Sequence, residues 1–123
     1  MSQITVSMTN FQKFTVTALV KDANGNNVAL NGLPDIVVNT PSLISVANVQ
    51  ADSASNPKQI TFDVLGVKTA TTGGTANISL ACDPGNGLAK FTVDAVTVNV
   101  SIDPREAGPA TTLSVSATTP VDQ

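Results

Sequence analysis

The residues that could bind a cation are few, and they stand in turn-like segments. Asp22, Asn24 and Asn26 place side-chain oxygens at alternate positions, as a calcium-binding loop does. The segment lacks the glycine at the sixth place and the later bidentate acid of such a loop. Asn24-Gly25 is also a strong signal for a tight hairpin turn, because glycine readily adopts a positive φ. The sequence therefore favours a plain turn here over a calcium site.

A second polar cluster is the segment Asp83-Pro84-Gly85-Asn86-Gly87. Asp83 and Asn86 could hold a cation between loops. These residue types are also those that build turns, each for its own backbone reason. We predict a turn, with neither a metal ion nor a cofactor.

The composition offers little for catalysis. The 123 residues include no His, Trp or Tyr and one Cys, and 12% are charged. A pair of carboxylates, as in glycoside hydrolases, is the arrangement that remains, but the acids are scattered singly. Without Trp or Tyr the chain also lacks the aromatic platforms on which sugars stack. We predict a protein that is not an enzyme, and sugar recognition is disfavoured.

Charge and hydropathy exclude further classes of partner. The net charge is −3 and the six basic residues are isolated from one another, which gives no basic surface for nucleic acid or for an anionic membrane. No apolar run approaches the roughly 18–20 residues that span a bilayer. Residues 1–7 have neither a basic start nor a continuous apolar stretch, so we expect no secretory signal and synthesis in the cytoplasm of a host.

Alternation of apolar and polar residues predicts strands along most of the chain. Phe14, Val16, Ala18 and Val20 share one face of a strand, and a turn at 21–27 leads to a returning strand. Further strands are predicted over 28–30, 36–40, 43–49, 60–65, 75–82 and 88–102, the last with a bulge at Asp94-Ala95. Cys82 ends one of these strands after Leu80 and Ala81, which favours a small buried hydrophobe over a reactive thiol. Apolar spacing of three and four residues is never sustained, so no helix is expected.

The pattern changes after Ile102. Two Pro and a Gly in 103–110 predict a linker, followed by a tail rich in Thr and Ser. We therefore divide the chain into a domain at 1–102 and a linker with an extended tail at 103–123. Within the tail, Thr112–Ala117 alternates like a strand. It could add a strand to the open edge of a neighbouring subunit or fray as an ordinary terminus, and the sequence leaves both open.

Three segments resemble the bacterial immunoglobulin-like family, in particular its group 2 domains. They are the turn from Val20 to Val28, the Thr40-Pro41-Ser42-Leu43-Ile44-Ser45-Val46 segment and the Gly73-Gly74-Thr75-Ala76-Asn77-Ile78-Ser79-Leu80 segment, in the order that the family has. The resemblance covers about residues 3–102, and the aliphatic Ile36-Val37-Val38 stands where the family often has a Trp. It implies an all-β fold, an immunoglobulin-like antiparallel β-sandwich of seven to eight strands with an extended C-terminal tail.

The resemblance also implies a function in binding. Such domains occur as repeats in adhesins and as decoration or cement proteins of phage capsids. A short chain with its own Met1 and no export signal favours the second use: a non-enzymatic virion protein on the capsid surface. Its partner would be the major capsid protein or another virion protein, and family analogy suggests a homo-oligomer such as a trimer. The alternative is an immunoglobulin-like adhesion module of a phage tail or cell surface that binds a host surface or carbohydrate.

The contacts of such a protein are expected at its two ends. We predict that Thr112, Leu113, Val115 and Ala117 in the tail form one interface segment. Ile4, Val6 and Phe11 near the N-terminus form a second.

Overall fold

Seven β-strands carry the period-two pattern in the computed structural model, which describes residues 3–103 and 110–123. They are β1 (Ile4–Thr9), β2 (Lys13–Leu19), β3 (Asp35–Val38), β4 (Ile44–Ala51), β5 (Gln59–Gly66), β6 (Gly74–Cys82) and β7 (Phe91–Ser101). The described residues contain no helix, and so none that could cross a membrane. The predicted all-β class is confirmed.

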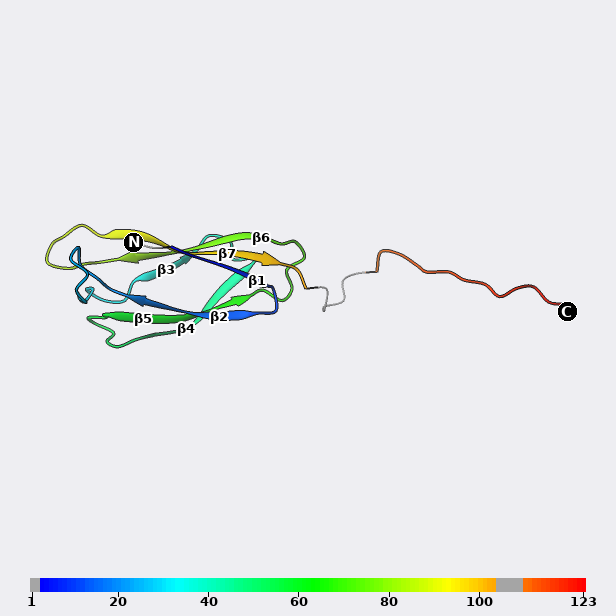
Figure 1. The fold of residues 1–123 in the computed structure, drawn as a ribbon, viewed down its shortest axis with the longest axis horizontal. Coiled ribbons are helices and arrows are strands. Elements are labelled where there is room, and N and C mark those ends of the chain that lie inside the picture. Colours follow the sequence, from blue (N-terminus) through cyan, green and yellow to red (C-terminus); the bar gives the residue numbers. More distant parts are fainter. Residues whose placement is uncertain (1–2, 104–109) are drawn as a thin grey trace.

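The strands form two sheets that lie face to face (Figure 1). One sheet has the order β1-β7-β6-β3 and the other has the order β2-β5-β4. Consecutive strands such as β1 and β2, or β3 and β4, therefore belong to different sheets. Each such connection crosses from one layer to the other and ties the two sheets together.

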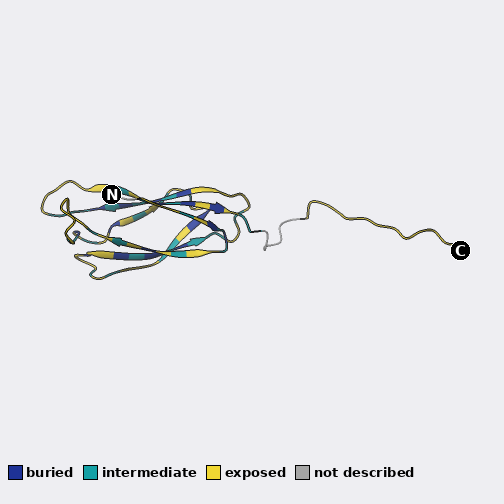
Figure 2. Cartoon of the chain, viewed as in Figure 1, coloured by how far each residue is buried: buried dark blue, intermediate teal, exposed yellow. Residues whose placement is uncertain are grey.

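The hydrophobic core lies between the sheets, because every second side chain of a strand points to the same face. Figure 2 shows the buried residues along the strands of both sheets. Ile60, Phe62 and Val64 of β5 are almost fully buried, as their alternation predicts. The core residues span Met8 to Val100, so the folded unit draws nothing from the tail. The full set is Met8, Val16, Leu30, Leu43, Ile44, Ile60, Phe62, Val64, Ala76, Ile78, Leu80, Cys82, Val96, Val98 and Val100.

One strand pair departs from the predicted antiparallel arrangement. β1 pairs with β7 in parallel, from Ile4 opposite Val96 to Thr9 opposite Ser101, whereas the other four pairs are antiparallel. The prediction of a wholly antiparallel sandwich is therefore wrong at this pair. The reason is topological: β1 and β7 are far apart in sequence, so no short hairpin constrains them to run in opposite directions.

The bulge predicted at Asp94-Ala95 is present in β7. Ile78 of β6 pairs with Val96 and the next residue, Ser79, pairs with Asp94, which leaves Ala95 without a partner on β6. An extra residue of this kind bends its strand and changes which side chains point inward.

The returning strand predicted at 28–30 is absent. The turn itself is confirmed, because Lys21 and Asn27 form an isolated antiparallel bridge and Gly25 has a φ of 82°. Beyond Val28 the chain leaves β2, and the backbone nitrogen of Leu30 donates to the carbonyl of Pro57 at 2.9 Å. Leu30 is buried in the core. Packing of this side chain therefore draws the backbone away from β2 before a second strand can form.

The tail residues 110–123 are exposed throughout and form no strand (Figure 2). The strand-like pattern at Thr112–Ala117 thus has no pairing partner in the described part of the chain. Most of the predicted linker, residues 104–109, lies outside the described residues.

Candidate functional site

The predicted N-terminal interface residues lie on one strand and on the turn that follows it. Ile4, Val6 and Met8 share a face of β1, and burial increases along it from 45% exposed at Ile4 to 6% at Met8, with Val6 in between. Phe11 is half-buried in the connection to β2. The side chain of Ile4 is therefore partly exposed to solvent at the start of β1, and Phe11 lies just beyond the end of that strand.

The predicted tail residues lie apart from these. Leu113 is 91% and Val115 is 86% exposed, and Thr112 and Ala117 are exposed as well. Figure 1 shows the tail leading away from the sandwich at the end where β7 finishes. Within one chain the structure does not bring the two predicted segments together.

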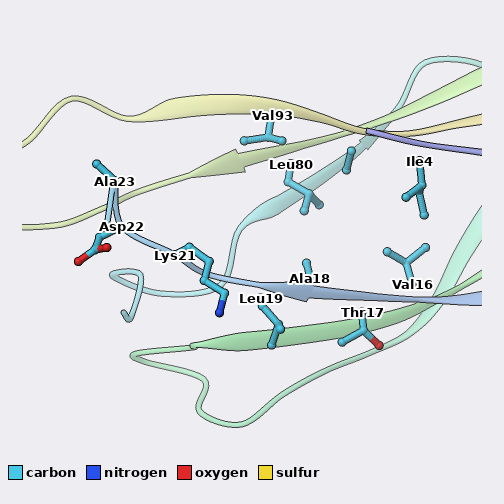
Figure 3. A pocket seen from close by; sticks show the side chains of 11 residues that line it. Ile4, Val16, Thr17, Ala18, Leu19, Lys21, Asp22, Ala23, Leu80 and Val93 are labelled. Atoms are coloured by element: carbon cyan, nitrogen blue, oxygen red, sulfur yellow. The ribbon is translucent and has the colours of Figure 1, made fainter. Parts of the chain in front are cut away.

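A hollow forms a seam at the side of the sandwich, between β2 and the start of β7. Its volume is about 680 Å³, and its apolar lining includes Ile4, Val16, Ala18, Leu80, Val93 and Ala95. Figure 3 shows Ile4 of β1 and Val16 of β2 directed toward each other across the gap. Lys21 and Asp22 line the mouth of the hollow near the hairpin turn.

The seam exists because β1 begins late. Its first residue, Ile4, pairs with Val96, so residues 91–95 of β7 have no strand beside them on that side among the described residues. β2 is the edge strand of the other sheet. Two open strand edges therefore border the same apolar hollow.

A smaller cavity of about 100 Å³ lies next to the seam. It shares Ala18, Leu80 and Val93 with the larger hollow and ends at Cys82 and Phe91. The two cavities therefore adjoin along the same stretch of β2, β6 and β7.

Cys82 is buried at the end of β6, as predicted. The exposed fraction of its side chain is 7%, and its Sγ lies 3.8 Å from the carbonyl oxygen of Leu80. Burial raises the pKa of the thiol because the thiolate would lose its hydration. The buried interpretation is confirmed, and the thiol is not tuned to act as a nucleophile.

The Asp22 carboxylate is engaged in the turn itself. Its Oδ1 accepts hydrogen bonds from the backbone nitrogens of Asn24 and Asn26, both at 2.9 Å, and its Oδ2 accepts one from the Asn26 amide at 3.3 Å. These bonds, led by the one from the Asn26 backbone, lower the pKa of Asp22. The turn therefore engages the side chains of Asp22 and Asn26 and the backbone nitrogen of Asn24.

The second polar cluster is a turn as well. Asp83 accepts from the backbone nitrogen of Gly85 at 2.9 Å and from the Asn31 amide at 3.3 Å. Gly85 and Asn86 both have positive φ, 77° and 55°. Nowhere in residues 3–103 and 110–123 do three His, Cys, Asp or Glu side chains gather as metal ligands.

In the described part of the chain, three surface carboxylates have a lowered pKa: Asp22, Asp52 and the partly exposed Asp63. The dominant cause is donated hydrogen bonds, from backbone amides at the first two and from the Thr15 hydroxyl at Asp63. A general acid at neutral pH needs a raised pKa instead. These carboxylates act as caps of turns and links between strands.

Sequence reasoning placed Ile4 at an interface but missed the rest of the seam. Ala18 and Val16 were recognised as inward-facing, and Ala95 as part of a bulge, yet no local pattern shows that they border a common hollow. Comparison of the chain with protein-family models and with curated proteins found no match. The function of the chain must therefore be inferred from its own residues and their geometry.

Proposed function

We propose that this protein is an immunoglobulin-like virion protein that decorates and stabilises a phage capsid. The observation that carries the proposal is a pair of exposed apolar side chains, Leu113 and Val115, on a strand-patterned tail that the folded domain does not use. Apolar groups left outside a complete core are typical of interaction segments. Such a segment suits a protein whose role is to hold other subunits.

The strand order supports the immunoglobulin-like assignment. Immunoglobulin domains place their second, fifth and fourth strands in one sheet and their third, sixth and seventh in the other. Here β2-β5-β4 and β3-β6-β7 have the same grouping, and β1 joins the second group through its pairing with β7.

The mechanism we propose is non-covalent stapling. Each copy would contact the major capsid protein and neighbouring copies through its two end segments, the exposed Ile4 region and the tail. Individually weak contacts repeated over a shell multiply into a stable lattice. Assembly as a homo-oligomer, for example a trimer at a local threefold axis, would fit this geometry.

Binding to phage shells tests the proposal directly. Expanded shells stripped of accessory proteins are mixed with the full-length chain, sedimented and imaged by electron microscopy. We expect saturable binding at regular lattice positions and a higher thermal disruption temperature of the decorated shells. Absence of binding to shells, with binding to host cells instead, would contradict the proposal.

A second candidate is an adhesion module that engages a host surface through its loops. Leu88, in the connection between β6 and β7, is 64% exposed, and Leu33, between β2 and β3, is 49% exposed. Apolar side chains on such loops are suited to contact a receptor. Replacing Leu88 with Asp would weaken attachment to cells in this case and leave attachment to shells unchanged.

A further inference from the structure

Two strand edges border the apolar seam and have no neighbour among the described residues. β2 pairs with β5 on one side only, and residues 91–95 of β7 pair with β6 on one side only. The unpaired N–H and C=O groups of an edge strand are a template for another strand. Of the two edges, β2 is the longer, seven residues against five, and it runs beside the hollow at Val16–Leu19.

The hollow is large enough for side chains. Its volume of about 680 Å³ falls within the range of roughly 300–1,000 Å³ that is usual for binding pockets. Its lining is mostly apolar and includes the side chains of Ile4, Val16, Ala18, Leu80, Val93 and Ala95. A strand added along β2 would point every second side chain into this space.

The tail has the complementary pattern. Leu113, Val115 and Ala117 fall on one face of an extended segment, and Thr112, Ser114 and Ser116 fall on the other. No charged residue occurs between Ala110 and Val121. At about 3.3 Å per residue, the six residues from Thr112 to Ala117 span about 20 Å, close to the length of the seven-residue β2.

The tail does not fill the seam of its own chain, because residues 110–123 are exposed throughout. It comes after β7, which ends at Ser101, whereas the seam lies beside Val93 and Ala95 near the start of that strand. β1 already occupies the side of β7 between these points, through the pairs from Ile4–Val96 to Thr9–Ser101. Leu113 and Val115 stay 91% and 86% exposed, so the tail leaves this seam free for another copy.

We infer that the Thr112–Ala117 segment of one copy adds to β2 of a second copy and inserts Leu113, Val115 and Ala117 into the seam. The contact is head-to-tail, so successive copies form an open chain or a closed ring. The inference rests on the proposed function for its purpose, the linking of copies on a shell. The contact itself is measured without shells, so the two can fail independently.

Sedimentation velocity of the full-length chain, over about a thousandfold range of concentration, is the first test. We expect the sedimentation coefficient to rise with concentration. The variant L113D/V115D, which puts charge on the apolar face of the tail, should weaken self-association at least about tenfold. The matched control S114D/S116D, with the same charges on the opposite face, should still associate.

A second test locates the acceptor site. Isotope-labelled full-length L113D/V115D is titrated with a synthetic peptide of residues 110–123 and followed by NMR. We expect amide shifts at Val16–Leu19, Val93 and Ala95. The peptide carrying the two Asp substitutions should leave these signals in place.

Disulfide trapping shows whether the contact joins two chains. Every variant carries C82A, so that the introduced cysteine is the one thiol in the chain. The V115C variant is mixed with the A95C variant and oxidised. As a control, V115C is mixed with V37C, whose cysteine lies on the edge strand β3. Covalent heterodimers of V115C with A95C and not with V37C would support the inference.

Other results would overturn it. A monomer at every concentration whose seam nonetheless takes up the peptide would place the tail in its own chain. Association that persists in L113D/V115D would place the contact elsewhere, and absence of both association and peptide shifts would reject the site. Shell binding by a non-associating protein would leave the proposed function standing without this contact.

Discussion

The side-chain oxygen of Asn10 accepts a hydrogen bond of 2.8 Å from the backbone nitrogen of Asp103, where the chain leaves the sandwich. Asn10 is the one buried polar residue in the described part of the chain, with 1% of its surface exposed. Its Nδ2 donates to the carbonyl of Lys68 at 3.0 Å, and its backbone nitrogen donates to the carbonyl of Ser101 at 3.0 Å. One residue thus joins the end of β7 to two loops.

Replacing Asn10 with Ala should lower the free energy of unfolding by about 1–3 kcal/mol, because it leaves buried hydrogen-bonding groups without partners. Asn99→Ala is the matched control, since Asn99 is exposed and its side-chain oxygen accepts from the Thr75 hydroxyl at the surface. Urea denaturation of both variants measures the difference. Equal losses of unfolding free energy in the two variants would show that the buried hydrogen bonds of Asn10 stabilise the fold no more than an exposed bond does.

Gly66 packs directly on the Asn10 backbone. A Cβ at Gly66 would lie 2.5 Å from the Asn10 carbonyl oxygen, a contact that neither backbone can relieve without moving. We expect Gly66→Ala to cost about 1–3 kcal/mol of unfolding free energy. Gly74→Ala serves as the control, because the nearest atom there is the flexible Leu43 Cδ1 at 3.3 Å. A thermal melt in which both variants lose the same stability would contradict the close approach.

Asp63 links the two edge strands of its sheet, and acid should break the link. Its carboxylate accepts from the Thr15 hydroxyl on β2 at 2.6 Å and from the Asn48 amide on β4 at 2.9 Å. These bonds, with the charge of Lys13, lower the pKa of Asp63 below the ordinary 3.8. The stabilisation is therefore complete above pH 3.8 and is lost as the pH falls through the lower, folded-state pKa.

NMR titration of the Asp63 carboxyl checks this assignment. Thr15→Val removes the strongest cause of the shift and should raise the pKa of Asp63 toward 3.8. Thr17→Val, two residues along the same exposed face of β2, should leave that pKa unchanged. An Asp63 pKa that responds equally to both substitutions would contradict the role of the Thr15 hydroxyl.

The raised pKa of Cys82 predicts slow thiol chemistry. At pH 8 the buried thiol should react with a disulfide reagent at least about tenfold more slowly than a free cysteine peptide, because less thiolate is present and access is restricted. Reaction in guanidinium chloride should match the peptide. Rapid modification of the native protein would indicate that the seam admits reagent as far as Cys82.

The tail should contribute nothing to the stability of a single copy. Leu113 and Val115 are almost fully exposed, so at protein concentrations too low for association the L113D/V115D variant should unfold within about 0.5 kcal/mol of the original chain. A larger loss at high dilution would mean that the tail packs on its own domain.

Much of the fold is encoded in local patterns. The inward faces of β2 and β5, the turns at Asp22 and Asp83 and the bulge at Ala95 were all predicted and are all present. Each depends on the alternation of neighbouring side chains or on the backbone freedom of Gly and Asn. These preferences act within a few residues and do not need the rest of the molecule.

The candidate site could be predicted only in part. Ile4 and the alternating tail were recognised as exposed apolar segments, and Cys82 as buried. The seam forms only where Val16, Leu80 and Val93 meet across two sheets. Val16 lies on β2, more than sixty positions before both Leu80 and Val93. No spacing rule connects them.

The sequence by itself determined the all-β class, the faces of most strands, the turns and the presence of a tail with a strand-like pattern after residue 102. Tertiary structure alone decided that β1 runs parallel to β7, that the chain after Val28 turns into the core, and that β1 begins too late to close the seam. The physical reason is the range of the interactions. Side-chain alternation and backbone φ preferences are properties of neighbouring residues, whereas strand partners are chosen by the burial of apolar faces across the whole chain.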